Sequence, residues 1–386
     1  MFFATVGHSE DVDTESALEE VIAQCKRDLN GRQVNAGLLF AGIDSEHQEL
    51  LNGINAAWPG IELVGCTTAG EFSSRLGLQE DSVCLILFGS DTVEITAGVG
   101  HEMSKDIPAA CRRAVSEARR KTRQNPALCI ALPESMTASG PQVLTALKAE
   151  LIGNVPVIGA TAGDQWQFEG TYQYCGKKVF SDALPILLFS GPLTYSFGVA
   201  SGWMPIGEPG RVTRSEGAVV FEIDDLPAMA FYRKYLGEAA KPSGECPLAI
   251  LNDGNEIQYL RAPAGVSIEA AEEITFFGDV PQGERVQITV TDRDAILAGC
   301  RYSIQEAKNG YPEDKTLEAA VFFSCGARKL LLGTRTAEEA VIIGEEIGKG
   351  VPMCGFYGYG ELGPVGSNSR DSMFHNETFI SLLMGT

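Results

Sequence analysis

Three short segments of this chain share one pattern: an apolar strand ends in glycine, small or aromatic residues follow, and a second glycine precedes an acid. The segments read GCTTAGE at 65–71, GATAGD at 159–164 and GFYGYGE at 355–361. The first two acids, Glu71 and Asp164, lie 93 positions apart, well beyond the period of a solenoid repeat. We therefore expect the chain to fold from internal copies of one unit.

The residues around each pattern predict the same order of strand, helix, strand, glycine turn and strand. In the first copy, helix 14–29 and strand 36–40 precede a helix that Ser45 and Gln48 open as a capping box, and strands 61–64, 82–88 and 93–99 follow. The second copy holds strand 127–132, helix 141–151 and strands 155–158, 183–189 and 194–200. The third holds strand 320–325, a helix capped by Thr336 with Glu339, and strands 351–354 and 377–384.

This order predicts an α/β fold with mixed sheets, built from repeated β-α-β-turn-β units, internally duplicated and divided into two domains. Breaks rich in glycine and proline around 207–210 and 224–227 place the domains at 1–224, with two repeats, and at 225–386. A candidate fourth unit comprises helix 226–236, strand 247–251 and the turn 252–256.

Composition and charge exclude several classes of protein. The 386 residues are 44% hydrophobic and 21% charged, which is typical of a globular protein, and no apolar run is long enough to cross a bilayer. The start lacks the features of a secretory leader, so we expect a cytoplasmic protein. A formal net charge of −21 disfavours binding to nucleic acid and insertion into membranes. One helix, near 107–123, is locally basic and is expected to be a solvated face, with a docking face for an acidic partner as the alternative.

Cysteine and histidine usage disfavours metal sites. None of the ten cysteines forms a Cys-x-x-Cys pair, and the four histidines are scattered. We expect reduced cysteines packed as small hydrophobes and no metal centre.

A glycine turn at the carboxyl end of a strand lets main-chain N–H groups approach a ligand, and such ends line the usual clefts of open α/β sheets. The acids that follow suit a cationic group such as an ammonium, and aromatic residues such as Trp166 can wall the pocket. Arg261 and Arg370 are the arginines that could pair with a ligand carboxylate. The equally available alternative is that each turn only ends its strand, with the acid capping local N–H groups. The predicted ligand-binding residues are Gly65, Thr67, Thr68, Gly70, Glu71, Thr161, Gly163, Asp164, Tyr357, Tyr359, Gly360, Glu361, His375 and Asn376.

Longer strings point to a family. VGCTTAGEF, CPLAILNDGNEIQYLRAP, GDVPQGERVQIT and GFYGYGELGP with FHNETF resemble the FIST family, a FIST N domain followed by a FIST C domain. The resemblance implies a sensory signal-transduction module that binds a small metabolite, with an amino acid as the expected class, and signals through a partner protein. It assigns no catalytic residue, and we expect no cofactor, with haem as the alternative.

Two other functions stay open at this level. A gas sensor with non-covalent haem would use His8, His47, His101, His375 or a thiolate as the axial ligand. An enzyme would use Cys66 or Cys325 as nucleophile with His375 as base, although we expect no enzyme.

Overall fold

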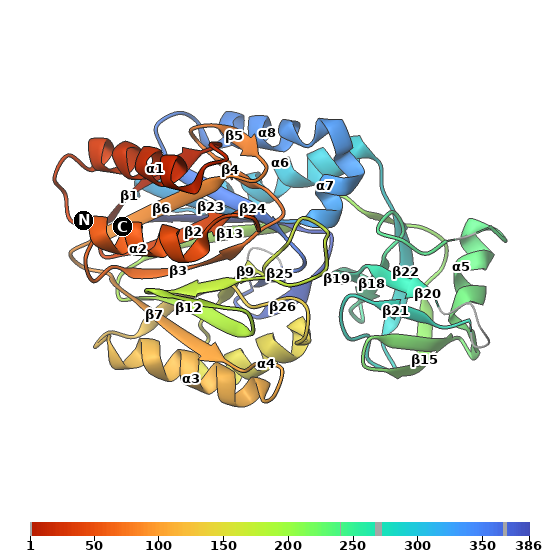
Figure 1. Cartoon of the computed structure of the whole chain (residues 1–386). Coiled ribbons are helices and arrows are strands. Elements are labelled where there is room, and N and C mark those ends of the chain that lie inside the picture. The colour runs from red at the N-terminus through yellow and green to blue at the C-terminus, as the bar shows by residue number, and fades with distance from the viewer. Residues whose placement is uncertain (1, 240, 267–271, 366–368) are drawn as a thin grey trace.

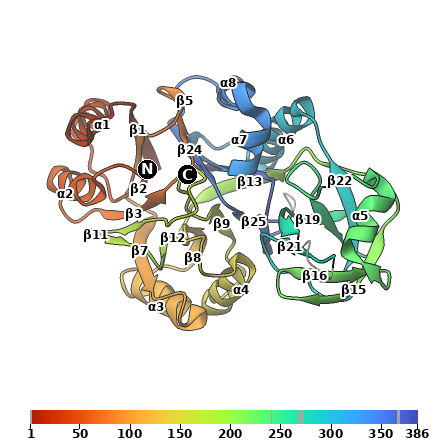
Figure 2. The same ribbon diagram turned by 45° about the vertical axis from the view of Figure 1, so that its right-hand side comes forward.

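The computed structural model describes residues 2–239, 241–266, 272–365 and 369–386. The chain folds into a ring of three similar units, with a separate lobe inserted into the third unit (Figure 1). In the turned view, pairs of helices lie on three sides of a central group of strands (Figure 2). The predicted α/β class with mixed sheets is confirmed.

Each unit starts with a long strand, alternates helices and strands, and ends with a short hairpin and another long strand. Unit 1 contains β1 (Phe2–Ser9), α1 (Thr14–Leu29), β2 (Ala36–Ala41), α2 (His47–Ala57), β3 (Glu62–Thr67), β4 (Glu71–Ser73), β5 (Gly77–Gln79) and β6 (Val83–Ser90). Unit 2 contains β7 (Glu94–His101), α3 (Ile107–Arg120), β8 (Pro126–Ala131), α4 (Gly140–Glu150), β9 (Val157–Ala160), β10 (Gln173–Cys175), β11 (Lys178–Phe180) and β12 (Ala183–Ser190). Unit 3 contains β13 (Thr194–Ala200), α6 (Arg293–Gly310), β23 (Leu317–Cys325), α7 (Gly326–Leu332), the 3-10 helix η1 (Gly333–Arg335), α8 (Ala337–Ile347), β24 (Met353–Gly358), β25 (Glu361–Pro364), β26 (Ser372–His375) and β27 (Phe379–Gly385).

The lobe lies between β13 and α6 of unit 3. It contains β14 (Met204–Pro205), β15 (Gly210–Glu216), β16 (Val219–Ile223), β17 (Leu226–Pro227), α5 (Ala228–Leu236), β18 (Leu248–Leu251), β19 (Ile257–Arg261), β20 (Pro263–Val266), β21 (Ile274–Phe276) and β22 (Arg285–Val290). Its strands form one sheet whose core includes Val212, Ile250 and Ile288, and Phe231 of α5 packs into that core. The lobe therefore has a hydrophobic core of its own.

The units exchange their hairpins around the ring. The β10–β11 hairpin of unit 2 pairs with β3 of unit 1, β25–β26 of unit 3 pairs with β9 of unit 2, and β4–β5 of unit 1 pairs with β24 of unit 3. Every unit thus completes the sheet of another unit. Because each sheet needs strands from two units, the ring folds as a single body.

Hydrophobic layers follow from this arrangement. The inner faces of the three sheets share one core, to which Phe40, Ile130 and Phe323 contribute. The outer face of each sheet carries its own helices: α1 and α2 on the first, α3 and α4 on the second, α6 and α8 on the third. Strands buried on both faces explain the continuous apolar runs in the sequence.

The predicted helix 14–29 is confirmed, with Asp13 accepting the N–H of Ser16 at 2.9 Å as its cap. The two predicted capping boxes are wrong. Gln48 instead donates to the carbonyl of Lys177 on the exchanged hairpin, at 3.0 Å. Thr336 makes no side-chain cap, and Glu339 pairs with Arg328 at 2.6 Å. In both cases the side chain that would complete the capping box binds a residue outside its own helix instead.

The candidate fourth unit is not a repeat. Its helix α5 and strand β18 exist, but β18 pairs antiparallel with β19 and β22 in the lobe sheet. Strand β13, assigned from sequence to the second copy, pairs with β27 and belongs to unit 3. The predicted boundary between residues 224 and 225 stays a prediction.

Candidate functional site

The three glycine turns meet near the centre of the ring and bind one another. Main-chain bonds run from Gly163 N to Thr67 O at 2.9 Å, from Thr161 N to Gly360 O at 2.8 Å, and from Ala69 N to Tyr357 O at 2.8 Å. The expectation that these N–H groups face a ligand is therefore wrong: each is satisfied by a carbonyl of another unit. We call this meeting of residues 65–71, 159–164 and 355–361 the hub.

Close main-chain contact explains two of the glycines. A Cβ added to Gly65 would lie 1.9 Å from the carbonyl oxygen of Leu39, and one on Gly163 would lie 3.0 Å from the nitrogen of Ala69. A side chain at residue 65 would clash with the main chain, and one at residue 163 would require the neighbouring main chain to shift, so these glycines serve the packing of the hub.

The hairpin registers correct which residues are equivalent. Glu71 stands opposite Gln79, Gln173 opposite Phe180, and Glu361 opposite His375. In all three hairpins the side chain accepts a main-chain N–H from the residue that lies three positions after its cross-strand partner. Glu71 accepts that of Ser82 at 3.3 Å, Gln173 that of Ala183 at 3.3 Å, and Glu361 that of Thr378 at 3.1 Å. The structural counterpart of Glu71 and Glu361 is thus Gln173, and Asp164 has another role because unit 2 has a longer segment between turn and hairpin.

Glu71 lies in a closed polar cluster inside unit 1. Its carboxylate accepts the hydroxyls of Thr68 and Ser82, the latter at 2.5 Å, and Ser82 also bonds Nε2 of His8 at 2.9 Å. Burial raises the pKa of Glu71 to about 7, against these hydrogen bonds, which lower it. Both oxygens have partners, so this group is satisfied without a ligand.

Asp164 anchors a cluster of three aromatic side chains, Trp166, Phe168 and Tyr359, which we call the aromatic wall. It accepts the hydroxyl of Tyr359 at 2.5 Å, and that hydroxyl accepts the N–H of Trp166 at 2.5 Å. The rings of Trp166 and Phe168 lie 5.4 and 5.1 Å from that of Tyr359, centroid to centroid. Gln165, Trp166 and Phe168 all have positive φ, a strained backbone that points to function rather than packing.

Three carboxyl oxygens of unit 3, one on Glu361 and two on Glu377, have no hydrogen-bond partner among the residues that the structure describes. Glu361 accepts the hydroxyl of Thr378 at 2.7 Å through one oxygen, while its other oxygen has no partner. Glu377 is 0% exposed and has a φ of 59°, and no residue that the structure describes donates a hydrogen bond to either of its oxygens. Burial raises the pKa of Glu361 to about 8 and that of Glu377 well above its usual value, with further repulsion between the two.

Glu377 is not among the residues predicted from sequence, although it directly follows Asn376. The repeat could have indicated Glu377, because Glu377 and Thr378 occupy the positions in unit 3 that Asp81 and Ser82 occupy in unit 1. Asp81 also has a positive φ, yet it is exposed and bonds the side chain of Gln165. The lobe covers the position in unit 3 and leaves it open in unit 1.

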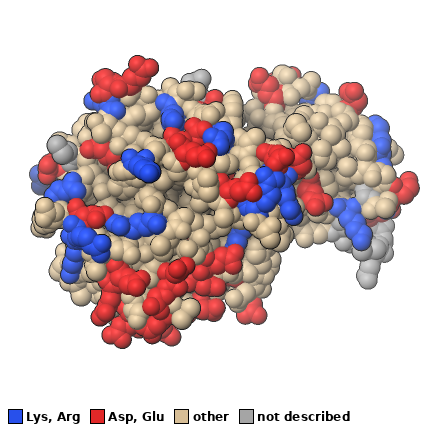
Figure 3. Space-filling view, turned by 90° about the horizontal axis from the view of Figure 1, so that it is seen from above, with Lys and Arg blue, Asp and Glu red and all other residues tan. Residues whose placement is uncertain are grey.

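A cavity of about 870 Å³ lies between the hub and the lobe. The ring lines it with Ser135, Met136, Trp166, Phe168, Arg293, Cys325, Ala327, Leu330, Leu331, Gly358, Tyr359, Asn376 and Glu377. The lobe lines it with Pro242, Ser243, Gly244, Glu245, Ala262, Pro263, Ala264, Gly265 and Phe277. Seen from above, the molecule narrows between these two parts (Figure 3). The volume of the cavity suits a small organic molecule.

Of the predicted ligand-binding residues, Tyr359 and Asn376 line this cavity, and Asn376 accepts the N–H of Ala262 in the lobe at 3.3 Å. The others lie in the hub or the core. Tyr357, for example, donates to Glu339 at 2.5 Å, and Nε2 of His375 bonds the carbonyl of Gly363 at 2.9 Å. Arg261 is 3% exposed and donates to the carbonyls of Leu260, Phe374 and Asp279, so it is a structural residue.

The residues of the two alternative functions separate in space. No histidine is among the described residues that line the cavity. Cys325 lines it, whereas Cys66 is buried in β3. Burial and nearby carboxyl groups raise the pKa of both thiols well above the usual value, which disfavours a thiolate. His375, with a pKa lowered to about 4 by burial, bonds a carbonyl.

Similar proteins occur in Mycobacterium tuberculosis and Methanocaldococcus jannaschii. An uncharacterized protein of Mycobacterium tuberculosis strain H37Rv is 23% identical over 376 residues, covering 94% of this chain and 95% of the relative. An uncharacterized protein of Methanocaldococcus jannaschii is 26% identical over 200 residues, covering 50% of this chain and 39% of the relative. A solved structure of a cyanuric acid hydrolase from A. caulinodans aligns over 100% of this chain at 9% identity, and its TM-score of 0.31 is too low to equate the folds.

The family assignment is direct. Residues 35–226 match the FIST N domain and residues 228–364 match the FIST C domain. FIST domains are associated with sensory signal transduction and with small-ligand binding. The chain belongs to the FIST family, as its sequence indicates. No helix in the described ranges combines the length and apolar character needed to cross a membrane.

Proposed function

We propose that this protein is a sensory module that binds a small cationic amine, with an amino acid as the expected class, in the cavity between hub and lobe. Occupancy of the cavity is then reported to a signalling partner. The observation that carries the proposal is Glu377, a fully buried carboxyl group at the cavity wall whose two oxygens have no hydrogen-bond partner within the described part of the chain.

A buried carboxyl group without a partner is costly, and a cationic ligand would remove the cost. An ammonium group would donate to the oxygens of Glu377 and favour its ionised form. Because burial holds the pKa of this group high, binding of a cation would release a proton. The affinity is expected to rise as the pH rises.

The aromatic wall supports the same class of ligand. Trp166, Phe168 and Tyr359 come together on one side of the cavity, held in place through Asp164. Aromatic faces attract ammonium groups more strongly where water is excluded. A carboxyl group and aromatic rings thus offer two complementary contacts to one cation.

Arg293 offers a contact for the other end of an amino acid. It lines the cavity, is exposed, and donates through Nε to the carbonyl of Leu331 at 3.0 Å. Its terminal nitrogens form no ion pair among the described residues, so they can receive a ligand carboxylate. We therefore propose for Arg293 the role in carboxylate binding that was expected for Arg261 or Arg370.

The lobe supplies a route from binding to signalling. It joins the ring through the segments on either side of residues 204–290 and lines one side of the cavity. A ligand that touches both parts binds best when they are close, so it favours one relative position of lobe and ring.

The test is a thermal-shift screen of the full chain against amino acids, polyamines and quaternary amines, followed by calorimetry on the hits. A ligand at a hundred times its dissociation constant adds about 2.7 kcal/mol of stability. We expect Glu377→Gln to abolish the shift. Asp81→Asn, at the equivalent exposed position of unit 1, should leave it unchanged. The proposal fails if no cationic compound binds, or if Glu377→Gln binds as the native chain does.

A further inference from the structure

A second surface of the ring differs in charge from the rest of the molecule. The chain has a formal net charge of −21, and a broad patch of Asp and Glu lies along the lower edge of the face in Figure 3. Helix α3 nevertheless carries Arg112, Arg113, Arg119 and Arg120 within its fourteen residues, and Lys121 follows it. Helix α3 and strand β7 lie at the lower left of Figure 1, away from the lobe.

These cations border a groove. A hollow of about 700 Å³ lies between α3, β7, β3 and the exchanged hairpin, with apolar residues such as Leu63, Val99 and Phe180 in its lining. Its basic lining residues are Arg112, Arg113, Arg120, Lys121, Lys177 and Lys178, and its acidic lining residues are Glu62 and Glu117. Units 1 and 2 both contribute to this surface, which we call the basic groove.

Several of these charges have no acidic partner. Lys121 pairs with Glu62 at 2.8 Å, and Arg112 pairs with Glu150 at 3.2 Å. Arg120, Lys177 and Lys178 are exposed and form no ion pair with any described residue. Basic residues at the end of α3 suit the helix dipole, but that reason does not extend to Lys177 and Lys178, which come from another element.

The edge of strand β7 in this groove is already occupied. Glu62 accepts the N–H of Ala97 at 2.8 Å, Glu117 accepts that of Val99 at 3.0 Å, and Lys121 donates to the carbonyl of Ala97 at 2.9 Å. A partner therefore cannot extend the sheet here without breaking these bonds. It would bind through side chains.

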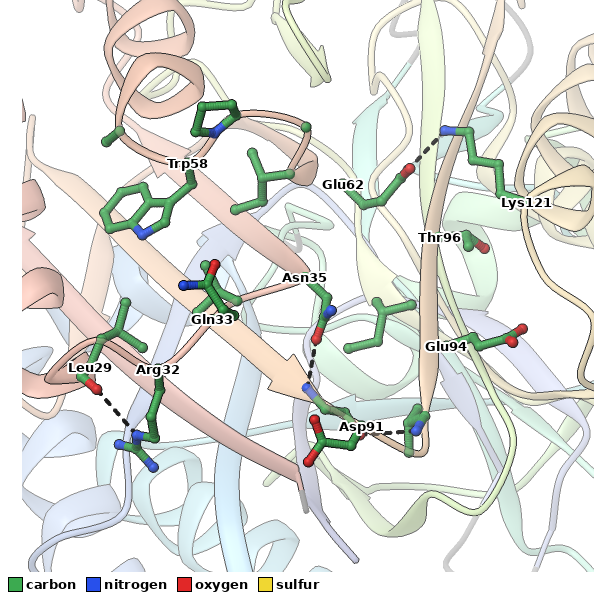
Figure 4. A pocket seen from close by; sticks show the side chains of 18 of the residues that line it. Leu29, Arg32, Gln33, Asn35, Trp58, Glu62, Asp91, Glu94, Thr96 and Lys121 are labelled. Carbon is green, nitrogen blue, oxygen red and sulfur yellow. Dashed lines mark hydrogen bonds and ion pairs between the residues drawn. The ribbon is translucent and has the colours of Figure 1, made fainter.

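The groove continues past the bridge between Lys121 and Glu62. A second hollow of about 660 Å³ shares Ile61, Glu62 and Lys121 with it. Figure 4 shows this hollow, with the bridge at one side and Trp58, Arg32 and Gln33 at the other. The two hollows together can receive an extended segment rather than a compact ligand.

We propose that the basic groove docks an acidic, partly apolar segment of a partner protein. Carboxylates of the segment would pair with Arg120, Lys177 and Lys178, and its apolar side chains would cover the apolar lining. The strongly negative remainder of the molecule repels long polyanions, so a short acidic protein segment fits better than a nucleic acid. The docking proposal does not depend on the ligand proposed for the cavity.

The experiment measures binding of the full chain to a fluorescent peptide that alternates glutamate and leucine, by anisotropy. The test variant is Arg120→Glu/Lys177→Glu/Lys178→Glu. The control variant is Arg27→Glu/Lys315→Glu/Lys349→Glu, which reverses three other exposed basic residues without an ion pair among the described residues and changes the net charge equally. Circular dichroism checks that both variants fold.

We expect saturable binding by the native chain and the control, weakened by salt, and a loss of at least about tenfold in affinity for the test variant. The proposal is overturned if the peptide does not bind, or if both variants lose affinity equally, since net charge alone would then explain the effect. It is also overturned if single-stranded RNA or vesicles of anionic lipid bind more tightly than the peptide at the same salt.

Discussion

Units 1 and 3 place the same two acidic positions in different surroundings. In unit 1, Glu71 has partners for both oxygens and Asp81 is exposed. In unit 3, one oxygen of Glu361 and both oxygens of the buried Glu377 have no hydrogen-bond partner in the described ranges. The inserted lobe makes the difference, because it covers the hairpin of unit 3 alone. Repetition therefore preserves the fold, while the insertion creates a candidate site at one copy.

The largest expected effect concerns the ion pair that unit 3 has beneath the junction with the lobe. Arg328 pairs with Glu339 at 2.6 Å, is 0% exposed, and also donates to the carbonyls of Ser201 and Ile296. Arg328→Met should destabilise the protein by about 3–5 kcal/mol, since it leaves Glu339 buried without its partner. Urea unfolding measures the change. A loss below about 1 kcal/mol would show that the pair is not needed at this junction.

The next effect tests the comparison itself. Glu71→Ala should cost about 1–3 kcal/mol, because Ser82 and Thr68 lose their acceptor in a buried site. Glu377→Ala removes a carboxyl group that has no partner, so the free energy of unfolding should change little or rise. The same urea titrations compare the two variants. Equal losses would mean that Glu377 has a structural role like that of Glu71.

The third prediction is a dependence of stability on pH. Burial raises the pKa of Glu361 from 4.5 to about 8, so the folded chain holds a proton that the unfolded chain releases in that range. Stability should therefore fall as the pH rises from about 4.5 to about 8, by at most about 1.4 kcal/mol per pH unit for this group.

Glu361→Gln should flatten that slope in urea unfolding series at several pH values. Because the pKa of Glu71 is raised only to about 7, Glu71→Gln should flatten the slope of stability against pH over a narrower range of pH. If the stability of native chain and variants rises with pH in parallel, neither carboxyl group is protonated in the folded state.

The smallest expected effect concerns the aromatic wall. Tyr359→Phe removes the hydroxyl that joins Asp164 to the N–H of Trp166, and should cost about 0.5–1.5 kcal/mol. The fluorescence of Trp166 should shift as its loop loses that contact. Tyr172→Phe provides a control at an exposed tyrosine. An unchanged spectrum and stability would show that the wall is held by ring packing alone.

Much of the ring could be predicted from sequence, since its strands and helices follow from local patterns. Helix 14–29 has its cap and its apolar stripe in adjacent residues, but strands β3 and β24 continue to Thr67 and Gly358, so the first and third turns begin later than the pattern places them. The residues of the candidate site were harder to predict from the sequence. The predicted residues Tyr359 and Asn376 line the cavity, whereas Glu377 and Arg293 were not predicted, because nothing local shows that the lobe, residues 204–290, meets the ring at these positions.

The equivalence of Asp164 with Glu71 also could not be read locally. The strings TAGE and TAGD agree, but the hairpin register assigns the position to Gln173. Register depends on pairing with another unit, and a longer segment in unit 2 moves the hairpin relative to the motif.

The sequence by itself determined the repeated unit, the strands and helices within it, and the family, because periodicity, turn residues and recurring strings are properties of neighbouring residues. The tertiary structure alone decided which units exchange hairpins, that N–H groups of each turn donate to carbonyls of another turn, and that Glu377 is buried while Asp81 is exposed. Burial and hydrogen-bond satisfaction are set by segments that meet from distant parts of the chain, and these contacts fix the charge state of a carboxyl group.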